Sequence, residues 1–373
     1  MKPRAVRQSA QANAFQTGMR EGYEAGRTIG WRDGAAEAVM QCIPVPEVKK
    51  SRLRILYIPQ GFEAIDQGVA EALREVCREV HIGHSSSMAE QASLIRPDLM
   101  LVLNGLHVFP DNHLEQADAV RAMGIRTAIW FADDPYVTGD TIKVAPHYDV
   151  ILTHELSTTE LYRQLGCREV HYLPLAVHHG LFKPFKVDRA YQSDVCFIGQ
   201  AFWNRVELFD AMAERLQGKK VFIAGGLWER LTKYDRLKHA IRMGWLPVEE
   251  SIKYYNGARI VVNIHRITTA GYDNKNELNY PGRSINPRTY EISACGTLQL
   301  TDVREDLSNY YRPGYELDTF NGPEECMAKI EHYLSHEEER QRIAIRGLRR
   351  TLQDHTFIIR IQQLLALVDP NPQ

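Results

Sequence analysis

The sequence predicts an α/β protein with two Rossmann-like domains and a helical segment in front of them. Short apolar runs rich in β-formers alternate with helical stretches from Arg52 to Pro174. After a polar stretch that carries a proline, a second alternation of the same kind starts at Asp194. This rhythm is typical of doubly wound parallel sheets. The 373 residues suffice for two such domains of about 150 residues each.

The composition excludes several classes of protein. The 45 basic and 47 acidic side chains nearly cancel, so nucleic acid is not a predicted partner. No uncharged apolar run reaches the roughly 18 residues of a membrane span, and no apolar run follows the basic N-terminus. The six cysteines are scattered without a C-x-x-C pair, which fits a reducing compartment. We therefore expect a cytoplasmic protein with no membrane span.

Residues 1–48 form the predicted helical extension, in which glycine recurs at every fourth position. The stripe consists of Gly18, Gly22, Gly26, Gly30 and Gly34. Each glycine inside a helix costs about 0.5–1 kcal/mol relative to alanine, so we expect the stripe to let a partner helix approach closely. Charged residues between the glycines exclude burial in lipid. We predict a homo-oligomer or docking through this segment; the alternative is a tail that packs on nothing.

The two domains are expected at residues 49–180 and 181–355. Helices of the first domain are predicted at about 63–79, 113–123 and 155–165. Helices of the second are predicted at about 203–216, 248–256 and 287–295. The segment 356–373 carries a last amphipathic helix, expected to pack back across the domains.

The second domain contains the best-delimited candidate site. Ligands of open α/β sheets bind beyond the carboxyl ends of the strands, where the run SINPRTYEISACGTLQLTD begins a short helix. Asn286 is a good N-cap and Pro287 suits the first helical position. The free N–H groups of this helix and Arg288 are suited to a diphosphate, and Glu291, one turn on, could accept hydrogen bonds from a ribose. The alternative is an ordinary ion pair between Arg288 and Glu291.

Four further residues lie at neighbouring strand ends. Gly199 permits a tight turn, and Arg205 could place a second cation on the leaving diphosphate. Gly225 offers a close backbone approach, which we expect toward the base of the nucleotide. His265 ends the strand VVNIH and could contact phosphate or the transferred sugar, or be a satisfied structural histidine.

The polar stretch 266–285 is too long for a simple connection and predicts a lid or substrate loop. Its candidate ligand contacts are Tyr272, Tyr280 and Arg283. No G-x-G-x-x-G follows a strand and no P-loop is present, so dinucleotide redox chemistry and P-loop hydrolysis lose their main support.

The runs FIGQAFWNR, VVNIHR, INPRTYEISACGTLQLTD and HTFIIR resemble the CgeB-like, spore-maturation-type glycosyltransferases, over roughly residues 50–369. The segment WFADDPYV resembles the N-terminal domain of the same family. The resemblance implies a GT-B fold, with two Rossmann-like domains facing a cleft, in which Arg288 holds the diphosphate and Glu291 the ribose. It also implies a nucleoside-diphosphate sugar as co-substrate, and related folds favour UDP.

Candidate bases for the acceptor hydroxyl lie at strand ends of the first domain. They are His107, Asp133, Asp134 and His154, of which the two aspartates are favoured. The alternative for the aspartates is a capped turn before Pro135. Arginines and a helix N-terminus can neutralise the leaving diphosphate, so we expect neither a cofactor nor an essential metal.

The resulting hypothesis is a glycosyltransferase of the hexosyl or N-acetylhexosaminyl class. The nucleotide sugar binds mainly to the second domain, and an acceptor (a glycan, a protein or a small molecule) binds mainly to the first. Two alternatives remain open at this point: a sugar-nucleotide epimerase with the same architecture, and an assembly protein whose body has lost turnover.

Overall fold

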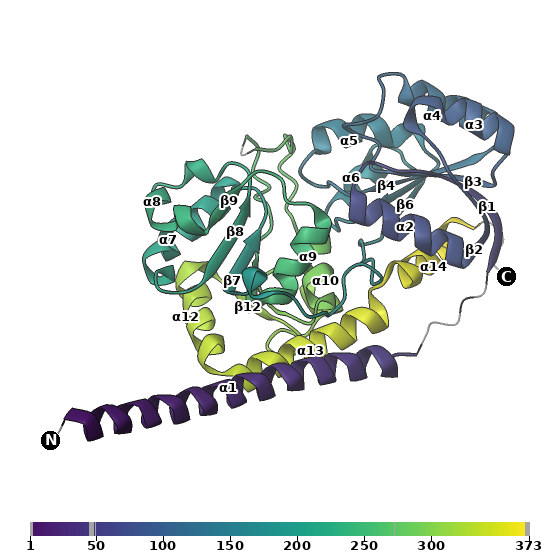
Figure 1. Ribbon diagram of the computed structural model, residues 1–373. Helices are drawn as coiled ribbons and strands as arrows, with labels where there is room; N and C mark the ends of the chain where they lie inside the picture. Colours follow the sequence, from purple (N-terminus) through teal and green to yellow (C-terminus); the bar gives the residue numbers. More distant parts are fainter. Residues whose placement is uncertain (1–2, 45–47, 49, 272, 370–373) are drawn as a thin grey trace.

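The structure, a computed structural model, describes residues 3–44, 48, 50–271 and 273–369. Two α/β domains lie side by side, and each is built on a six-stranded sheet (Figure 1). The strand order is β2-β1-β3-β4-β5-β6 in the first sheet and β12-β11-β10-β7-β8-β9 in the second. All the pairings are parallel. The α/β prediction with two Rossmann-like domains is confirmed.

The first domain, called the N-domain, alternates strands and helices. Its elements are β1 (Ser51–Ile58), α2 (Glu63–Val76), β2 (Cys77–Ile82), α3 (Met88–Ile95), β3 (Leu99–Leu103), α4 (His113–Ala122), β4 (Arg126–Phe131), α5 (Thr138–Val144), β5 (Val150–Thr153), α6 (Thr158–Gln164) and β6 (Glu169–Tyr172). Helix α6 starts three residues later than predicted, because the Glu155 carboxylate accepts a hydrogen bond from the N–H of Ser157 and forms a turn there.

The second domain, called the C-domain, begins after a connection from Tyr172 to Ser193. Its elements are β7 (Ser193–Ile198), α7 (Trp203–Leu216), β8 (Val221–Gly225), α8 (Tyr234–Leu237), β9 (Ile241–Met243), α9 (Val248–Gly257), β10 (Ala258–Asn263), α10 (Pro287–Ala294), β11 (Leu298–Asp302), α11 (Leu307–Tyr310), β12 (Asp318–Phe320), α12 (Gly322–Ser335) and α13 (Glu337–Asp354). The edge strands β9 and β12 were not predicted, since three residues are too few to show a periodic pattern.

Apolar side chains fill both faces of each sheet. In the N-domain, α2 packs on one face, and α3, α4 and α6 pack on the other. In the C-domain, α7 and α12 cover one face, and α9 and α10 cover the other. The last helix, α14 (Phe357–Val368), returns to the N-domain and packs on α2. Gly68 of α2 makes room for it, because a Cβ there would lie 2.4 Å from the Phe357 ring.

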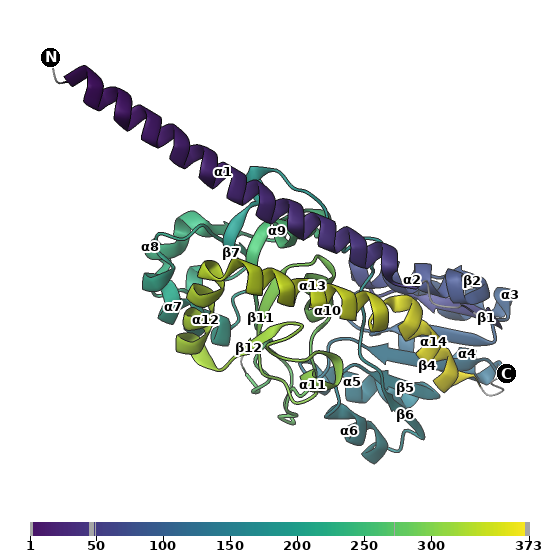
Figure 2. The same ribbon diagram turned by 90° about the horizontal axis from the view of Figure 1, so that it is seen from below.

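The N-terminal helix α1 (Pro3–Cys42) is about 60 Å long and runs beside α13, with its first half projecting from the body (Figures 1 and 2). The guanidinium of Arg32 fixes its second half by donating to the carbonyls of Asn256 and Cys295 and to the hydroxyl of Thr297. These acceptors lie at the carboxyl ends of α9 and α10, where the helix dipoles favour a cation.

The glycine stripe of α1 is not the face that docks. A methyl group placed on Gly18, Gly22, Gly26, Gly30 or Gly34 would meet no atom of the described chain within 4 Å. The docking face instead carries Arg32 and the buried Ala36. The prediction that another helix packs against these glycines is therefore wrong for the helices of the same chain. Among the described residues, no helix is long and apolar enough to cross a membrane.

Candidate active site

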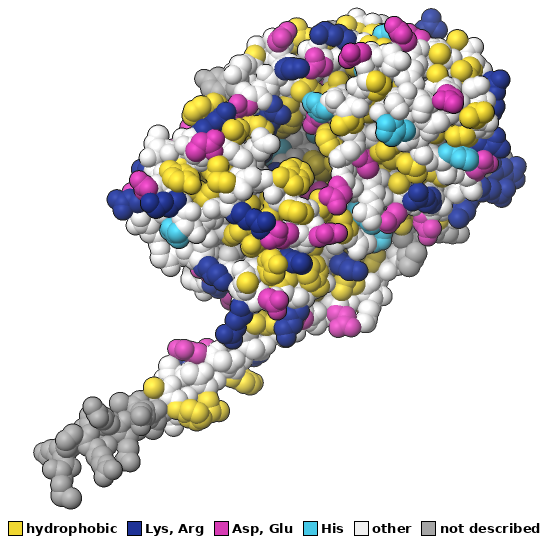
Figure 3. All heavy atoms as spheres, turned by 45° about the horizontal axis from the view of Figure 1, so that its top comes forward, with side chains coloured by type: hydrophobic (Ala, Val, Ile, Leu, Met, Phe, Trp, Pro, Cys, Tyr) yellow, Lys and Arg dark blue, Asp and Glu magenta, His cyan; other side chains and the backbone are white. Residues whose placement is uncertain are grey.

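The crevice that the sequence predicted lies where the order of the second sheet reverses. Strand β7 pairs with β8 on one side and with β10 on the other, so the chain leaves the carboxyl ends of β7 and β10 in opposite directions. Helix α10 begins at this edge and faces the N-domain, and the molecular surface is hollowed between the two domains (Figure 3).

The start of α10 is held by two asparagines that exchange hydrogen bonds. The Asn286 side-chain oxygen caps the helix by accepting from the Thr289 N–H at 3.1 Å, as predicted. The side-chain amide of Asn286 donates to the Asn263 oxygen, and the amide of Asn263 donates back, each at 3.1 Å. The Asn286 side chain is thus occupied, and it serves the donor site by positioning the helix.

His265 also positions this helix. Its Nδ1 lies 2.6 Å from an oxygen of Asp302, and its Nε2 accepts from the backbone N–H of Asn286 at 2.9 Å. The imidazole is 1% exposed, and burial lowers its pKa to about 4 despite Asp302, so the ring is neutral. The predicted contact of His265 with phosphate or sugar is corrected, because both ring nitrogens have partners within the protein.

Arg288 and Glu291 lie one turn apart on α10 and remain available for a ligand. Both side chains are half-buried, and neither makes a hydrogen bond or an ion pair within the described part of the chain. Burial raises the pKa of Glu291 to about 7, although the charge of Arg288 opposes this. An unpaired carboxyl and an unpaired guanidinium at a helix N-terminus are typical of a ligand site. They do not form the ion pair considered as the alternative.

Arg205 lies behind this site. Its Nε and Nη2 donate to the Ile264 carbonyl at 3.1 and 2.9 Å, and its Nη1 donates to the Gln200 carbonyl at 2.9 Å. Burial, followed by the like charge of Arg288, lowers its pKa to about 9. Because carbonyls occupy these donors, the predicted second cation can act on a diphosphate through its charge and not through these N–H groups. Arg205 contributes positive potential to the crevice.

The two glycines at strand ends pack against the protein itself. Gly225 has a φ of +144°, and a Cβ there would lie 2.0 Å from the Gly199 carbonyl oxygen. The close approach predicted for Gly225 is thus to the backbone of Gly199 and not to a base. A Cβ on Gly199 would lie 3.0 Å from the Nη1 of Arg205, so this glycine makes room for the guanidinium.

On the N-domain side of the cleft, His107, Asp133 and Asn104 form a connected group. Asp133 accepts from the Asn104 side-chain amide at 2.8 Å and lies 3.1 Å from the Nε2 of His107. Burial alone would raise the pKa of Asp133, but the bonds from His107 and Asn104 outweigh it and lower the pKa. The hydrogen bond between His107 and Asp133 also raises the pKa of His107, whose side chain is 53% exposed. The pair presents a proton-exchanging imidazole to solvent, backed by an ionised carboxylate.

Asp134 has a different environment from its neighbour. It is completely buried, and its carboxylate accepts hydrogen bonds from four hydroxyls. The donors are Thr141 (3.2 Å), Thr153 (2.7 Å), Thr158 (3.1 Å) and Tyr162 (2.8 Å). Burial raises its pKa. The predicted catalytic role of Asp134 is corrected, because no substrate could reach this carboxylate.

The loop 266–285 joins the domains. The Glu155 carboxylate of the N-domain accepts from the backbone N–H groups of Arg283 and Ser284. The Lys275 N–H donates to the Tyr136 carbonyl at 2.7 Å, and the Gly139 N–H donates back to the Lys275 carbonyl at 3.0 Å.

The three residues singled out in this loop have different outcomes. Tyr280 is half-buried and held through its backbone N–H and carbonyl by Asn276. The Arg283 guanidinium pairs with Glu305 at 3.3 Å near the surface. Tyr272 lies outside the described residues.

Two residues that the sequence analysis missed lie in the cleft itself. The Arg266 guanidinium stacks on Tyr136 of the N-domain and on Phe202 of the C-domain. The two missed residues are Arg266 and Tyr136. Each is the neighbour of a residue already singled out, since Arg266 follows His265 and Tyr136 follows the Asp-Asp-Pro turn. Both lie in the segments that follow β10 and β4, and this position was the signal that could have identified them.

Two cavities are open at the surface, one away from this cleft and one beside Asp302, which holds His265. One of about 670 Å³ is at the amino ends of β4, β5 and β6, lined by Arg126, Asp149 and Glu169 among others. The other, of about 410 Å³, is bordered by Asn204, Asp302 and Phe320. Within the described residues, no cluster of three or more histidine, cysteine or acidic side chains could hold a metal ion.

Comparisons with known proteins agree with this geometry. Residues 205–366, most of the C-domain together with α14, match the family described as glycosyl transferase-like. The spore protein CgeB of Bacillus subtilis (strain 168) is 29% identical over 315 residues, which are 82% of this chain and 95% of that protein. The resemblance to the CgeB-like glycosyltransferase family is confirmed.

Solved structures share the fold at low identity. HepE of Anabaena, solved with UDP-glucose, superposes with a TM-score of 0.58 at 11% identity, covering 86% of this chain and all of that one. An alpha-glucosyltransferase in complex with UDP-glucose and abasic DNA gives 0.61 at 10% identity, covering 85% and 99%. The chain has the GT-B fold.

Proposed function

We propose that this protein transfers a sugar from a UDP-sugar to an acceptor bound at the N-domain, without an essential metal. The observation that carries the proposal is the pair Arg288 and Glu291. These two charged side chains are unpaired within the described chain, and they lie in the first two turns of α10, which begins where the strand order reverses. Sites of this kind in α/β sheets bind phosphorylated ligands.

The donor is expected to lie across the first turn of α10. Pro287 has no N–H and the Asn286 N–H is bound by His265, so the N–H and guanidinium of Arg288 are directed to the diphosphate. The carboxylate of Glu291 accepts from the ribose hydroxyls. UDP is the preferred nucleotide because the HepE and alpha-glucosyltransferase structures of the same fold were solved with UDP-glucose.

The transfer itself requires one bond exchange at the anomeric carbon. The bond from this carbon to the β-phosphate oxygen breaks, its electron pair stays on that oxygen, and the acceptor oxygen bonds to the carbon. The acceptor proton passes to the His107–Asp133 pair, which lies on the opposite side of the cleft. We assign the base to this pair because Asp134 is enclosed.

The proposed metal independence is supported by the positive charge of the crevice. Arg205 and Arg288 lie close enough for the charge of Arg288 to lower the pKa of Arg205, after burial. Together with the α10 dipole they can neutralise the leaving diphosphate. We expect turnover to be unchanged by EDTA. The transferred group is proposed to be a hexosyl or N-acetylhexosaminyl residue.

The experiment is a thermal-shift and calorimetric screen of the full chain with UDP, GDP, dTDP and their sugars, with and without magnesium. Hydrolysis and transfer assays follow on each ligand that binds. Metal-independent binding of UDP with release of sugar supports the proposal. Release of an epimerised nucleotide sugar without acceptor would indicate an epimerase, and binding without turnover would favour an assembly role.

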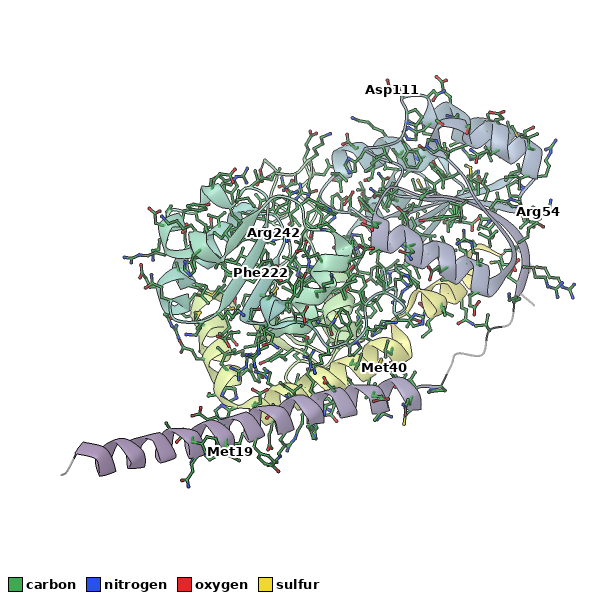
Figure 4. All side chains as sticks on the ribbon, viewed as in Figure 1. Met19, Met40, Arg54, Asp111, Phe222 and Arg242 are labelled. Atoms are coloured by element: carbon green, nitrogen blue, oxygen red, sulfur yellow. The ribbon has the colours of Figure 1, made fainter. Side chains whose placement is uncertain are left out.

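A second part of the proposal concerns partners: we assign homo-oligomer formation to the projecting half of α1. Large apolar side chains are exposed there, namely Phe15 (69%), Met19 (62%, labelled in Figure 4) and Tyr23 (72%). Met19 and Tyr23 each follow a glycine of the stripe by one position, so a second copy could place them against it. Deleting residues 1–24 retains Arg32 and should lower the number of subunits per particle, measured by light scattering. An unchanged number of subunits would refute this assignment.

The proposal also includes a cytoplasmic location. It rests on the six cysteines, all of which are free in the structure. Fractionation of cells that produce the protein would test it.

A further inference from the structure

Arg266 occupies an unusual position between the two domains. It follows His265 at the end of β10, and its guanidinium carbon lies 4.5 Å from the centre of the Phe202 ring in the C-domain. On the other side it lies 5.0 Å from the centre of the Tyr136 ring in the N-domain. Aromatic faces attract a cation without neutralising it. The arginine is therefore held in place while its charge stays available.

The carboxylates near Arg266 are committed to other groups. Asp273 forms a two-point ion pair with Arg230, at 2.6 and 3.0 Å. Asp133 accepts from His107 and Asn104. Arg266 itself donates its Nη2 to the Asp273 carbonyl, and its Nε is buried without an acceptor. A half-buried guanidinium with an unsatisfied N–H and no carboxylate partner in the described chain is suited to an anion.

Its neighbours indicate which anion. Arg205 lies near both Arg288 and Arg266, and the charges of both lower its pKa, after the effect of burial. The donors of Arg205 are bound to carbonyls, so Arg288 and Arg266 are the two members of this cluster with donors to spare. Negative charge develops on the β-phosphate oxygen as the bond to the sugar breaks.

We propose that Arg266 is a catalytic residue that binds the β-phosphate of the leaving UDP when the two domains are closed on each other. The inference rests on the proposed function and adds a ligand to its donor site. Closure of the domains is required because Tyr136, one of the two rings that hold the Arg266 guanidinium, belongs to the N-domain. The loop after Arg266 holds this arrangement through the Lys275 N–H bond to the Tyr136 carbonyl.

The test compares UDP and UMP binding by calorimetry in the wild type, Arg266→Gln and Arg266→Lys. Arg266→Gln should weaken UDP binding about tenfold or more while UMP binding stays within about twofold, because only UDP carries the β-phosphate. Arg266→Lys, which retains the charge, should fall in between. Turnover of Arg266→Gln should drop about 100-fold, with a smaller change in KM.

Arg346→Gln is the matched control. Arg346, in α13, is also a half-buried arginine, stacked 4.0 Å from the centre of the Tyr315 ring, and its variant should bind UDP as the wild type does. Equal loss of UMP and UDP binding in Arg266→Gln would show a structural role and overturn the inference. Wild-type UDP affinity in Arg266→Gln would also overturn it and leave the proposed function standing. A wild type that binds no UDP would refute both.

Discussion

Replacing Glu291 by glutamine should stabilise the free protein and weaken nucleotide binding. The pKa of Glu291 is raised from the ordinary 4.5 to about 7 by burial, so its ionised form destabilises the fold. At about 1.4 kcal/mol per pH unit this amounts to about 3 kcal/mol when the carboxyl is fully ionised. Because the side chain keeps partial contact with water, we expect about 2 kcal/mol.

The sign of the effect sets the pH window. The native state holds the Glu291 proton more tightly than the unfolded chain, so wild-type stability falls as pH rises from 4.5 to about 7 and is then level. Glu291→Gln lacks this dependence. Its Tm should equal that of the wild type near pH 4.5 and exceed it by about 4–8 °C at pH 8.

UDP binding should change with pH in the opposite direction. Ribose hydroxyls donate to the carboxylate, so UDP affinity of the wild type should rise between pH 6 and 8, as Glu291 ionises. Glu291→Gln should bind UDP about tenfold or more weakly at pH 8, without this rise. Thermal melting and calorimetry over this range measure both effects. Parallel profiles for the two proteins would refute the assignment of Glu291.

Three further substitutions separate chemistry from structure. Asp133→Asn should reduce transfer about 100-fold or more with UDP affinity unchanged, and normal turnover would remove Asp133 from the mechanism. Asp134→Ala removes the buried carboxylate that four hydroxyls share and should lower the free energy of unfolding by about 3 kcal/mol, seen in Tm; an unchanged Tm would contradict the structural role. Arg32→Ala should lower the free energy of local opening of α1 by about 2 kcal/mol, measured as faster amide exchange in residues 28–42. Unchanged exchange would show that Arg32 does not hold the helix.

The parts of the site that could be predicted from the sequence depend on local signals. The cap at Asn286, the proline at the first helical position and the one-turn spacing of Arg288 and Glu291 all lie within six residues, and the structure contains each of them. The alternation of strands and helices likewise revealed both domains. Features of this kind can be predicted without knowing which distant segments of the chain pack beside them.

The errors involve partners that are distant in the sequence. Asp133 and Asp134 share one turn, but Tyr162 and the strand end at Thr153 enclose only the second. His265 could not be assigned without knowing that Asp302 lies beside it. The glycine pattern of α1 predicted close packing, yet the helix docks through Arg32, whose acceptors lie more than 200 residues away.

The measurement that tests the central claim most directly is a calorimetric titration of UDP into the wild type and into Glu291→Ala, with and without magnesium. The proposed donor site predicts that the wild type binds UDP equally well in both buffers and that the variant does not bind. Equal affinity in the variant, or a wild type that binds no UDP, would contradict it.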